Sequence, residues 1–355
     1  MIADNPAPMT SSELGELRER IEAHLSKATT GAVSIASIEK LAGGACQDNY
    51  VLVATFAAGA FEGVRKLVLR SDANTSLPGS LSRQKEYAVI RAAAAAGVRT
   101  PEARWLASDL LRPGTYAYFL DWVGGEAIGR RVVAASKFAL ARERLPAECA
   151  TQLARIHSIT PATHATLFEA GPEQPSSGNP AADALAFARR MLDTLPERRP
   201  ALELALHWLR ANTPTTPATT TLVHGDFRTG NFLVTEAGLS AVLDWEFAHW
   251  GAPAEDIAWM CVRDWRFGQL RLAAGGFARR AVLYEAYERA SGRPLSVRDV
   301  HFWEVMGNVR WAAASLHQGE RYMSGGDADI ELVAVARRAI EMEYEALRLI
   351  ERGPS

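Results

Sequence analysis

The chain has 355 residues, 48% of them hydrophobic and 23% charged, and its 39 basic and 41 acidic residues give a formal net charge of -2. This composition is typical of a folded globular protein and excludes a disordered or fibrous chain, while the length allows two lobes. The near balance of charge excludes the broad basic surface that nucleic acids or anionic membranes require, so we expect a small-molecule partner.

Cysteine usage and the chain start indicate a cellular compartment. The three cysteines, Cys46, Cys149 and Cys261, lie far apart and cannot build a disulfide framework. The sequence shows no signal-peptide pattern and no run of about 18 apolar residues. We therefore expect a cytoplasmic protein without a membrane span, and the sequence leaves its oligomeric state open.

The first third of the chain is rich in β patterns. A capping box at Thr10-Ser11-Ser12-Glu13 predicts a helical extension over residues 10–28. The runs "VSIASIEKL", "NYVLVATF" and "RKLVLR" predict three antiparallel strands, and "SRQKEYAVIRAAAAAG" predicts a helix that stops at Gly97. With two more strands at "ARWLAS" and "TYAYFLDWV", we predict an N-terminal lobe over residues 1–122 with a five-stranded sheet.

Residues 123–355 read as a second lobe that is mainly helical. "NTPTTPATTT" predicts a linker, and "NFLV" and "LSAVLDW" predict a β-hairpin with its turn at residues 236–238. The clearest later helices are "VHFWEVMGNVRWAAASLHQ" and one continuous helix at "ELVAVARRAIEMEYEALRLIE". A small β-rich lobe followed by a larger helical one predicts an α+β fold.

The stretch "LVHGDFRTGNFLV", residues 222–234, places several polar side chains between two apolar runs. Asp226 and Asn231 are five residues apart, and Asp244 follows thirteen residues after Asn231 at the far end of the hairpin. One carboxylate and one amide oxygen suit a hard cation such as Mg²⁺, and the remaining carboxylate can accept a proton. The purely structural alternative is a β-turn in which these side chains only form hydrogen bonds with backbone groups.

These motifs resemble the aminoglycoside phosphotransferase and choline-kinase-like family of small-molecule kinases. "HGDFRTGNFLV" followed by "VLDWEFAHWGAPAEDIAW" is similar to the family's paired signature, and the resemblance extends from about Leu41 to Trp259. It implies a protein-kinase-like bilobal fold and transfer of the γ-phosphoryl group of ATP, with Mg²⁺, to a hydroxyl group of a small molecule.

The resemblance also assigns roles in this loop. It implies that Asp226 is the catalytic base and that Asn231 and Asp244 are the Mg²⁺ ligands. His224 is expected to brace the loop, and Asp256 to act behind it as a supporting acid.

Two further residues, Arg228 and His157, lie in or near these motifs. Arg228 stands where its guanidinium could offset charge on the transferring phosphoryl group, and solvent exposure is an equal alternative. His157 in "LARIHSI" is expected to brace a loop or the core instead of taking part in catalysis.

The nucleotide contacts implied by the resemblance fall in the first lobe. Gly43 and Gly44 resemble the turn that covers the nucleotide phosphates, although paired glycines are also ordinary turn residues. The family pattern places Arg70 at the phosphate-binding cation of the third strand, where kinases usually carry Lys and where a branch associated with acyl-CoA dehydrogenases carries Arg. Lys66 on the same strand face is the alternative, and Glu86 is the expected partner.

"FLDWVGGEAI" resembles the hinge between the two lobes. The backbone of Asp121, Trp122 and Val123 is therefore expected to hydrogen-bond the adenine edge, because adenine sites are apolar slots with a few backbone contacts.

The sequence leaves the phosphoryl acceptor open. Residues 251–355 carry 15 acidic and 14 basic residues, so the acidic excess that suits a cationic aminoglycoside is missing. We expect five arginines near the pocket rim, and these favour an anionic alcohol such as a hydroxyacyl-CoA: Arg263, Arg266, Arg271, Arg279 and Arg280. The alternatives are an aminoglycoside O-phosphotransferase and a non-catalytic nucleotide-binding protein. A zinc hydrolase is disfavoured because no HxxxH or HxH pair occurs.

Overall fold

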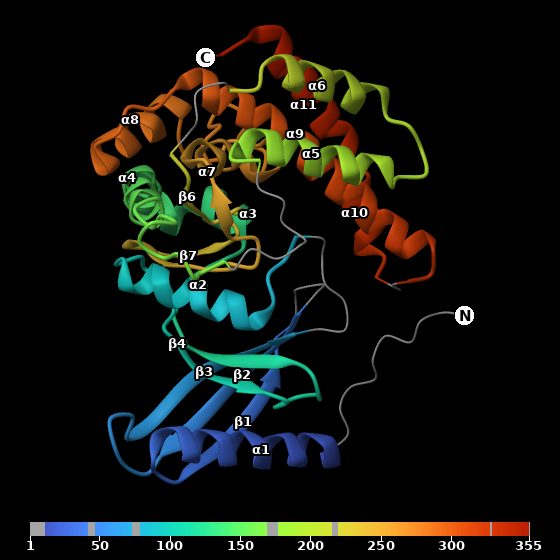
Figure 1. The fold of residues 1–355 in the computed structure, drawn as a ribbon. Helices are drawn as coiled ribbons and strands as arrows, with labels where there is room; N and C mark the ends of the chain where they lie inside the picture. The colour runs from blue at the N-terminus through green and yellow to red at the C-terminus, as the bar shows by residue number, and fades with distance from the viewer. Residues whose placement is uncertain are drawn as a thin grey trace. The chain divides into compact units, whose positions relative to one another are not determined.

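The structure is a computed structural model that describes residues 11–41, 47–72, 79–168, 177–214, 219–326 and 329–354. The described residues form two compact units (Figure 1). The sheet unit comprises Ala7–Gly124 together with Ser240–Ala248, and the helical unit comprises Gly125–Leu239 together with His249–Ser355. The chain therefore leaves the helical unit for nine residues and then returns to it.

The sheet unit contains a five-stranded antiparallel sheet in the order β1-β2-β3-β5-β4. Its strands are β1 (Val33–Lys40), β2 (Gln47–Phe56), β3 (Gly63–Asp72), β4 (Ala103–Ser108) and β5 (Tyr116–Asp121). All five expected strands are confirmed. Their alternating apolar and polar residues put successive side chains on opposite faces of the sheet.

Helices α1 (Ser11–Thr29) and α2 (Arg83–Ala95) cover opposite faces of this sheet (Figure 1). Leu17, Ile21 and Leu25 of α1 pack with Leu67 and Leu69 of β3 in one apolar core. Since Arg70 follows Leu69 on the strand, its side chain points to the other face of the sheet, where it contacts Glu86 of α2. The alternation thus separates a structural face of β3 from a polar one.

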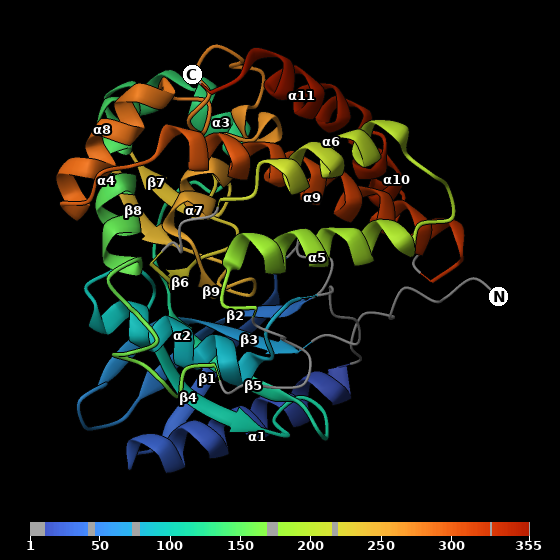
Figure 2. The same cartoon turned by 45° about the horizontal axis from the view of Figure 1, so that its top comes forward.

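The helical unit is arranged around α9 (Val297–Met323). Figure 2 shows α5, α6, α10 and α11 packed along it, and α7 also contacts it. The remaining elements are α3 (Gly129–Ala134), η1 (Ser136–Phe138), α4 (Ala139–Ile156), α5 (Pro180–Asp193), α6 (Pro200–Ala211), α7 (Pro253–Trp259), η2 (Arg263–Arg266), α8 (Arg280–Ser291), α10 (Glu331–Ala336) and α11 (Ala339–Arg352). The expected α+β architecture, with a small β-rich part and a larger helical part, is confirmed.

The expectation of one continuous helix over residues 331–351 is wrong. The chain breaks after Ala336 into α10 and α11, although neither Gly nor Pro occurs there. Both helices pack on α9, where Leu332 and Met342 are buried, and Arg338 at the break forms an ion pair with Asp264. Tertiary packing therefore overrides the uninterrupted helical pattern.

Two pairs of short strands frame the polar loop. β6 (Thr221–Val223) pairs with β9 (His249–Gly251), and β7 (Phe232–Thr235) pairs with β8 (Gly238–Val242). The hairpin is confirmed, but its second strand ends at Val242 instead of continuing through Trp245. Asp244 has a φ of 64°, in the left-handed region, which interrupts extended backbone. Among the described helices, none combines the length and apolar character needed to cross a bilayer.

Candidate active site

Asp256 of α7 holds the loop between β6 and β7 through hydrogen bonds to the loop backbone. One carboxylate oxygen of Asp256 accepts the backbone N–H of His224 at 2.7 Å, and the other accepts that of Gly225 at 2.9 Å. Nε2 of His157 lies 3.1 Å from the first oxygen. Burial acts to raise the pKa of Asp256, but His157 and His224 outweigh it, so the pKa lies below its ordinary value of 3.8.

His157 itself is fixed from its other side. Its Nδ1 lies 2.8 Å from the hydroxyl of Tyr287 on α8, and burial raises the pKa of that hydroxyl, so Tyr287 remains a donor. The same ring thus contacts Tyr287 through Nδ1 and the carboxylate of Asp256 through Nε2. The expectation that His157 braces a loop is confirmed, because it orients the carboxylate that holds the backbone of residues 224 and 225.

We expect Asp256→Asn to destabilise the protein by about 3 kcal/mol at pH 7, because it removes the charged partner of a buried hydrogen-bonded cluster. A carboxyl whose folded pKa is lowered contributes stability above its unfolded pKa and loses it as the pH falls through the folded pKa. The difference between wild type and variant should therefore shrink below about pH 4. Urea unfolding at pH 7 and pH 3 checks this; an equal difference at both pH values would contradict it.

The carboxylate of Asp226 receives three side-chain donors. Oδ1 accepts Nε–H of Arg228 at 2.9 Å and Nε1–H of Trp259 at 2.6 Å, while Oδ2 accepts from Nδ2 of Asn231. Its backbone N–H donates to Nδ1 of His224 at 3.2 Å. The structure thus places Asp226, Asn231, Arg228 and His224 in one cluster with a fixed carboxylate orientation.

Arg228 is not a freely solvated side chain. Its guanidinium lies 4.2 Å from the centre of the Trp265 ring while Nε pairs with Asp226, and its side chain is 21% exposed. The solvent-exposed alternative for this residue is therefore wrong.

Two residues that contact this loop were not identified from the sequence. Trp259 lies three residues after Asp256 on α7, so both face the loop, and this spacing was the available signal. Arg310 of α9 donates to the carbonyl of Gly225 at 2.7 Å and to Glu255 at 2.8 Å. No sequence signal pointed to Arg310, because its contact spans 85 residues.

The sheet unit holds a second polar cluster around Arg70. Its Nε donates to Glu86 at 3.1 Å, and its Nη2 donates to Glu86 at 2.8 Å and to Asp244 at 2.6 Å. The expected Arg70–Glu86 pair is therefore present. Burial acts to lower the pKa of Arg70, but Glu86, Tyr118 and Asp244 raise it well above its ordinary value. Arg70 is a permanent cation with a carboxylate on each side.

Acidic and basic groups continue around this cluster. Arg83 pairs with Glu86 and lies 3.5 Å from Glu246. Burial, together with the charge of Asp244, raises the pKa of Glu246 to about 7, against the opposing effect of Arg70. Asp244 is the more accessible carboxylate, with its side chain 31% exposed.

Other expected nucleotide contacts are placed as follows. Lys66 lies with its ammonium 3.7 Å from the centre of the Trp122 ring. The N–H groups of Asp121 and Trp122 donate to backbone carbonyls at 3.1 Å each. Gly43 and Gly44 lie outside the described residues.

The predicted arginine rim is wrong for three of its five members. Arg266 is buried and donates to Glu304 and Glu345, each at 3.1 Å. Arg280 also pairs with Glu304, and Arg263 lies 3.7 Å from Glu345. These arginines neutralise buried glutamates, whose positions a count of charged residues over 251–355 does not give. Arg271 and Arg279, in contrast, are exposed.

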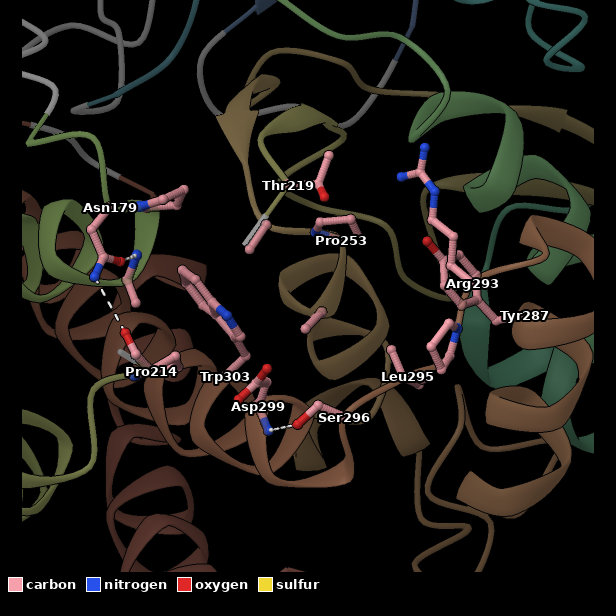
Figure 3. Close-up of a pocket in the computed structure, with 15 residues that line it drawn as sticks. Asn179, Pro214, Thr219, Pro253, Tyr287, Arg293, Leu295, Ser296, Asp299 and Trp303 are labelled. Carbon is pink, nitrogen blue, oxygen red and sulfur yellow. Dashed lines mark hydrogen bonds between the residues drawn. The ribbon is translucent and has the colours of Figure 1, made fainter. Parts of the chain in front are cut away.

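A pocket of about 330 Å³ lies elsewhere in the helical unit (Figure 3). It is bordered by the start of α5, the start of α7 and the loop into α9, with Trp303 and Asp299 on its wall. None of the loop residues from 224 to 231 lines it. The pocket is therefore not the place where Asp226 would meet a reactant, although Tyr287 on its wall touches His157.

The described residues have a protein-kinase-like fold. A model described as "Phosphotransferase enzyme family" matches residues 37–295, and the chain belongs to that family. The expected enzyme class, a phosphotransferase, is confirmed.

Curated relatives agree with the expected branch. The chain is 31% identical over 201 residues to acyl-CoA dehydrogenase family member 10 of Mus musculus, covering 56% of this chain and 18% of that protein. It is 30% identical over 175 residues to the probable acyl-CoA dehydrogenase IBR3 of Arabidopsis thaliana, covering 44% of this chain and 20% of that protein. The chain thus spans about a fifth of the length of these relatives.

Solved structures share the fold at low identity. A candidate aminoglycoside phosphotransferase from Ralstonia eutropha JMP134 has a TM-score of 0.73 and 22% identity, with 95% of this chain and 99% of that chain covered. A choline/ethanolamine kinase family protein from Mesorhizobium loti has a TM-score of 0.58 and 16% identity, with 94% and 95% covered. The GDP and kanamycin complex of APH(2″)-IIIa has a TM-score of 0.57 and 14% identity, with 92% and 97% covered.

Proposed function

We propose that this protein transfers the γ-phosphoryl group of ATP to a hydroxyl group of a small molecule in a Mg²⁺-dependent reaction, with Asp226 as the base. The observation that carries the proposal is the arrangement at Asp226. Its carboxylate is fixed by Arg228, Trp259 and Asn231 in a loop whose backbone is tied to Asp256. Positioning of this kind is most of what a phosphoryl-transfer enzyme supplies.

Asp226 orients the acceptor hydroxyl and takes its proton as the new O–P bond forms. Arg228 lies beside it as a cation that can turn toward the transferring phosphoryl group, since its side chain is partly exposed. His224 holds the loop through the backbone N–H of Asp226 and stays out of the proton transfer.

The proposed Mg²⁺ ligands are Asn231 and Asp244, and their donor chemistry fits this ion. Nδ2 of Asn231 is used by Asp226, so Oδ1 is the atom suited to a hard cation. Asp244 offers a partly exposed carboxylate. When bound, Mg²⁺ would neutralise the phosphate oxygens of the nucleotide. The described residues contain no group of three or more His, Cys, Asp or Glu side chains suited to a metal, and an ion shared with nucleotide phosphates needs none.

We assign the nucleotide to the polar face of β3 and to the chain after β5. Arg70 is the proposed phosphate-binding cation, because Glu86 holds it on that face. The N–H groups of Asp121 and Trp122 are already used, so the carbonyl of Asp121 and the amide of Val123 are the proposed adenine contacts. Gly43 and Gly44 remain proposed phosphate contacts from the sequence motif alone.

We expect Arg70→Lys to weaken ATP binding by about 10-fold. Lys cannot keep the bidentate contact with Glu86 and also bind a further acceptor, and the loss of this hydrogen bonding costs about 1.5 kcal/mol. Isothermal titration with ATP and Mg²⁺ measures the effect. A larger loss in Lys66→Met than in Arg70→Lys would instead assign the phosphates to Lys66.

The preferred acceptor is a hydroxyacyl-CoA or another anionic alcohol. The proposal is supported by Arg70 in place of Lys, by relatives named as acyl-CoA dehydrogenase family members and by the lack of acidic excess in residues 251–355. The pairing of Arg266, Arg280 and Arg263 with glutamates means that these three arginines do not support an anionic acceptor.

The experiment is a coupled screen for release of ADP from ATP, or of GDP from GTP, over hydroxyacyl-CoA compounds, aminoglycosides, amino alcohols and sugars. We expect turnover with a hydroxyacyl-CoA and none with aminoglycosides. Turnover with an aminoglycoside alone would reverse the substrate assignment. Omission of the acceptor is the control, since nucleotide hydrolysis without an acceptor is background.

A further inference from the structure

Trp259 differs from Arg228, another side-chain donor to Asp226, in how firmly it is held. Arg228 has a long side chain that is 21% exposed, whereas Trp259 is 5% exposed and its ring has no flexible end. Its Nε1–H donates to Oδ1 of Asp226 at 2.6 Å. A buried donor to a carboxylate is a strong, charge-assisted hydrogen bond.

Arg310 and Gly307, two residues of α9, lie against the indole ring. The guanidinium of Arg310 lies 4.7 Å from the ring centre and is itself bonded to Glu255 and Gly225. At Gly307, an added Cβ would come within 3.3 Å of Cε3 of Trp259 and 2.9 Å of Val262. Glycine costs about 1 kcal/mol inside a helix, and here its lack of a side chain admits the ring.

A neighbouring tryptophan shows that such a contact does not follow merely from burial. Trp265 packs 5.7 Å from Trp259, centre to centre, and is equally buried. Its Nε1 has no hydrogen-bond partner among the described residues. The hydrogen bond from Trp259 to Asp226 therefore depends on the position of this ring, which α7 carries and residues of α9 contact.

We propose that Trp259 is a positioning residue that keeps the carboxylate of Asp226 in its orientation while Arg228 moves to the phosphoryl group. Oδ1 has two donors at present, Arg228 and Trp259. When Arg228 turns toward a more highly charged phosphate, Trp259 remains on Oδ1 and Asn231 on Oδ2, so the carboxylate keeps its rotamer. The inference rests on the proposed function and adds a residue that the loop motif does not contain.

The test compares two replacements of the same ring. Trp259→Phe keeps an aromatic ring and removes the donor, whereas Trp259→His keeps an N–H at the equivalent ring position. We expect Trp259→Phe to lower kcat by roughly 10- to 100-fold with KM for ATP within about 2-fold, since a hydrogen bond to a charged group is lost. Trp259→His should retain kcat within about 5-fold. Trp208→Phe on α6, where the ring packs against His301, is the matched control and should leave kcat unchanged.

Equal loss in the Phe and His variants, or a kcat in Trp259→Phe within 2-fold of wild type, would overturn the inference. If Trp259→Phe does not fold, Gly307→Ala serves instead, because it retains the N–H but displaces the ring. It should lower kcat by about 5-fold, and an unchanged kcat contradicts the inference. Asp226→Asn is measured in parallel: an inactive Asp226→Asn with a fully active Trp259→Phe rejects only the role of Trp259, whereas an active Asp226→Asn rejects the proposed base.

Discussion

Asp226→Asn is expected to lower kcat by at least 100-fold and up to about 10,000-fold, the range that a general base contributes. The amide oxygen can still accept from Arg228 and Trp259, the amide nitrogen cannot accept from Asn231, and the loop backbone stays tied to Asp256. What disappears is the atom that takes the proton of the acceptor. Nucleotide affinity should remain within about 3-fold, because the proposed nucleotide contacts belong to other residues.

Steady-state ADP release at saturating acceptor measures kcat, and titration calorimetry measures ATP binding. Circular dichroism and thermal melting verify that the variant is folded. A kcat within 10-fold of wild type would remove the base assignment. A parallel collapse of ATP affinity would show that Asp226 acts in binding and not in the chemical step.

Asp244→Asn is expected to weaken Mg²⁺-dependent binding of ATP by roughly 10- to 100-fold, because it removes the charge of a proposed metal ligand. Asn is the informative replacement, since it tolerates the left-handed φ of 64° at this position better than Ala. Arg70 keeps its two bonds to Glu86, so the cation stays in place. Binding of ATP in the absence of Mg²⁺ should change less.

Asp109→Asn is the matched control for this variant. Asp109 belongs to the same unit, has a left-handed φ of 59° and accepts the N–H of Gly114 at 2.6 Å, in a turn that carries no proposed ligand. Mg²⁺ titrations of ATP binding should be unchanged in Asp109→Asn and shifted in Asp244→Asn. Identical titrations for the two variants would overturn the role of Asp244.

Local patterns predicted the elements that carry the site. The alternation in "RKLVLR" placed Arg70 on the face opposite Leu69, and it pairs there with Glu86. The five-residue spacing of Asp226 and Asn231 brought their side chains together within one loop. Contacts of this range follow from strand periodicity and short-loop geometry, which the neighbouring residues alone determine.

Contacts between distant segments could not be predicted in the same way. The helical pattern at 331–351 contained no signal for the break after Ala336, because burial against α9 decides it. The arginines at 263, 266 and 280 read as a cationic rim, yet buried glutamates from α9 and α11 neutralise them. A charge count along the chain carries no information on which charges meet.

By itself, the sequence determined the family, the five-stranded sheet and the residues of the loop from His224 to Asn231, because motif spacing and side-chain periodicity act over a few residues. Only the tertiary structure decided which groups hold that loop: Asp256 and His157 beneath its backbone, Trp259 on the carboxylate of Asp226 and Arg310 on Gly225. The physical reason is that hydrogen bonds and ion pairs depend on distances of about 3 Å, and for residues far apart in the chain those distances are set by how the helices pack.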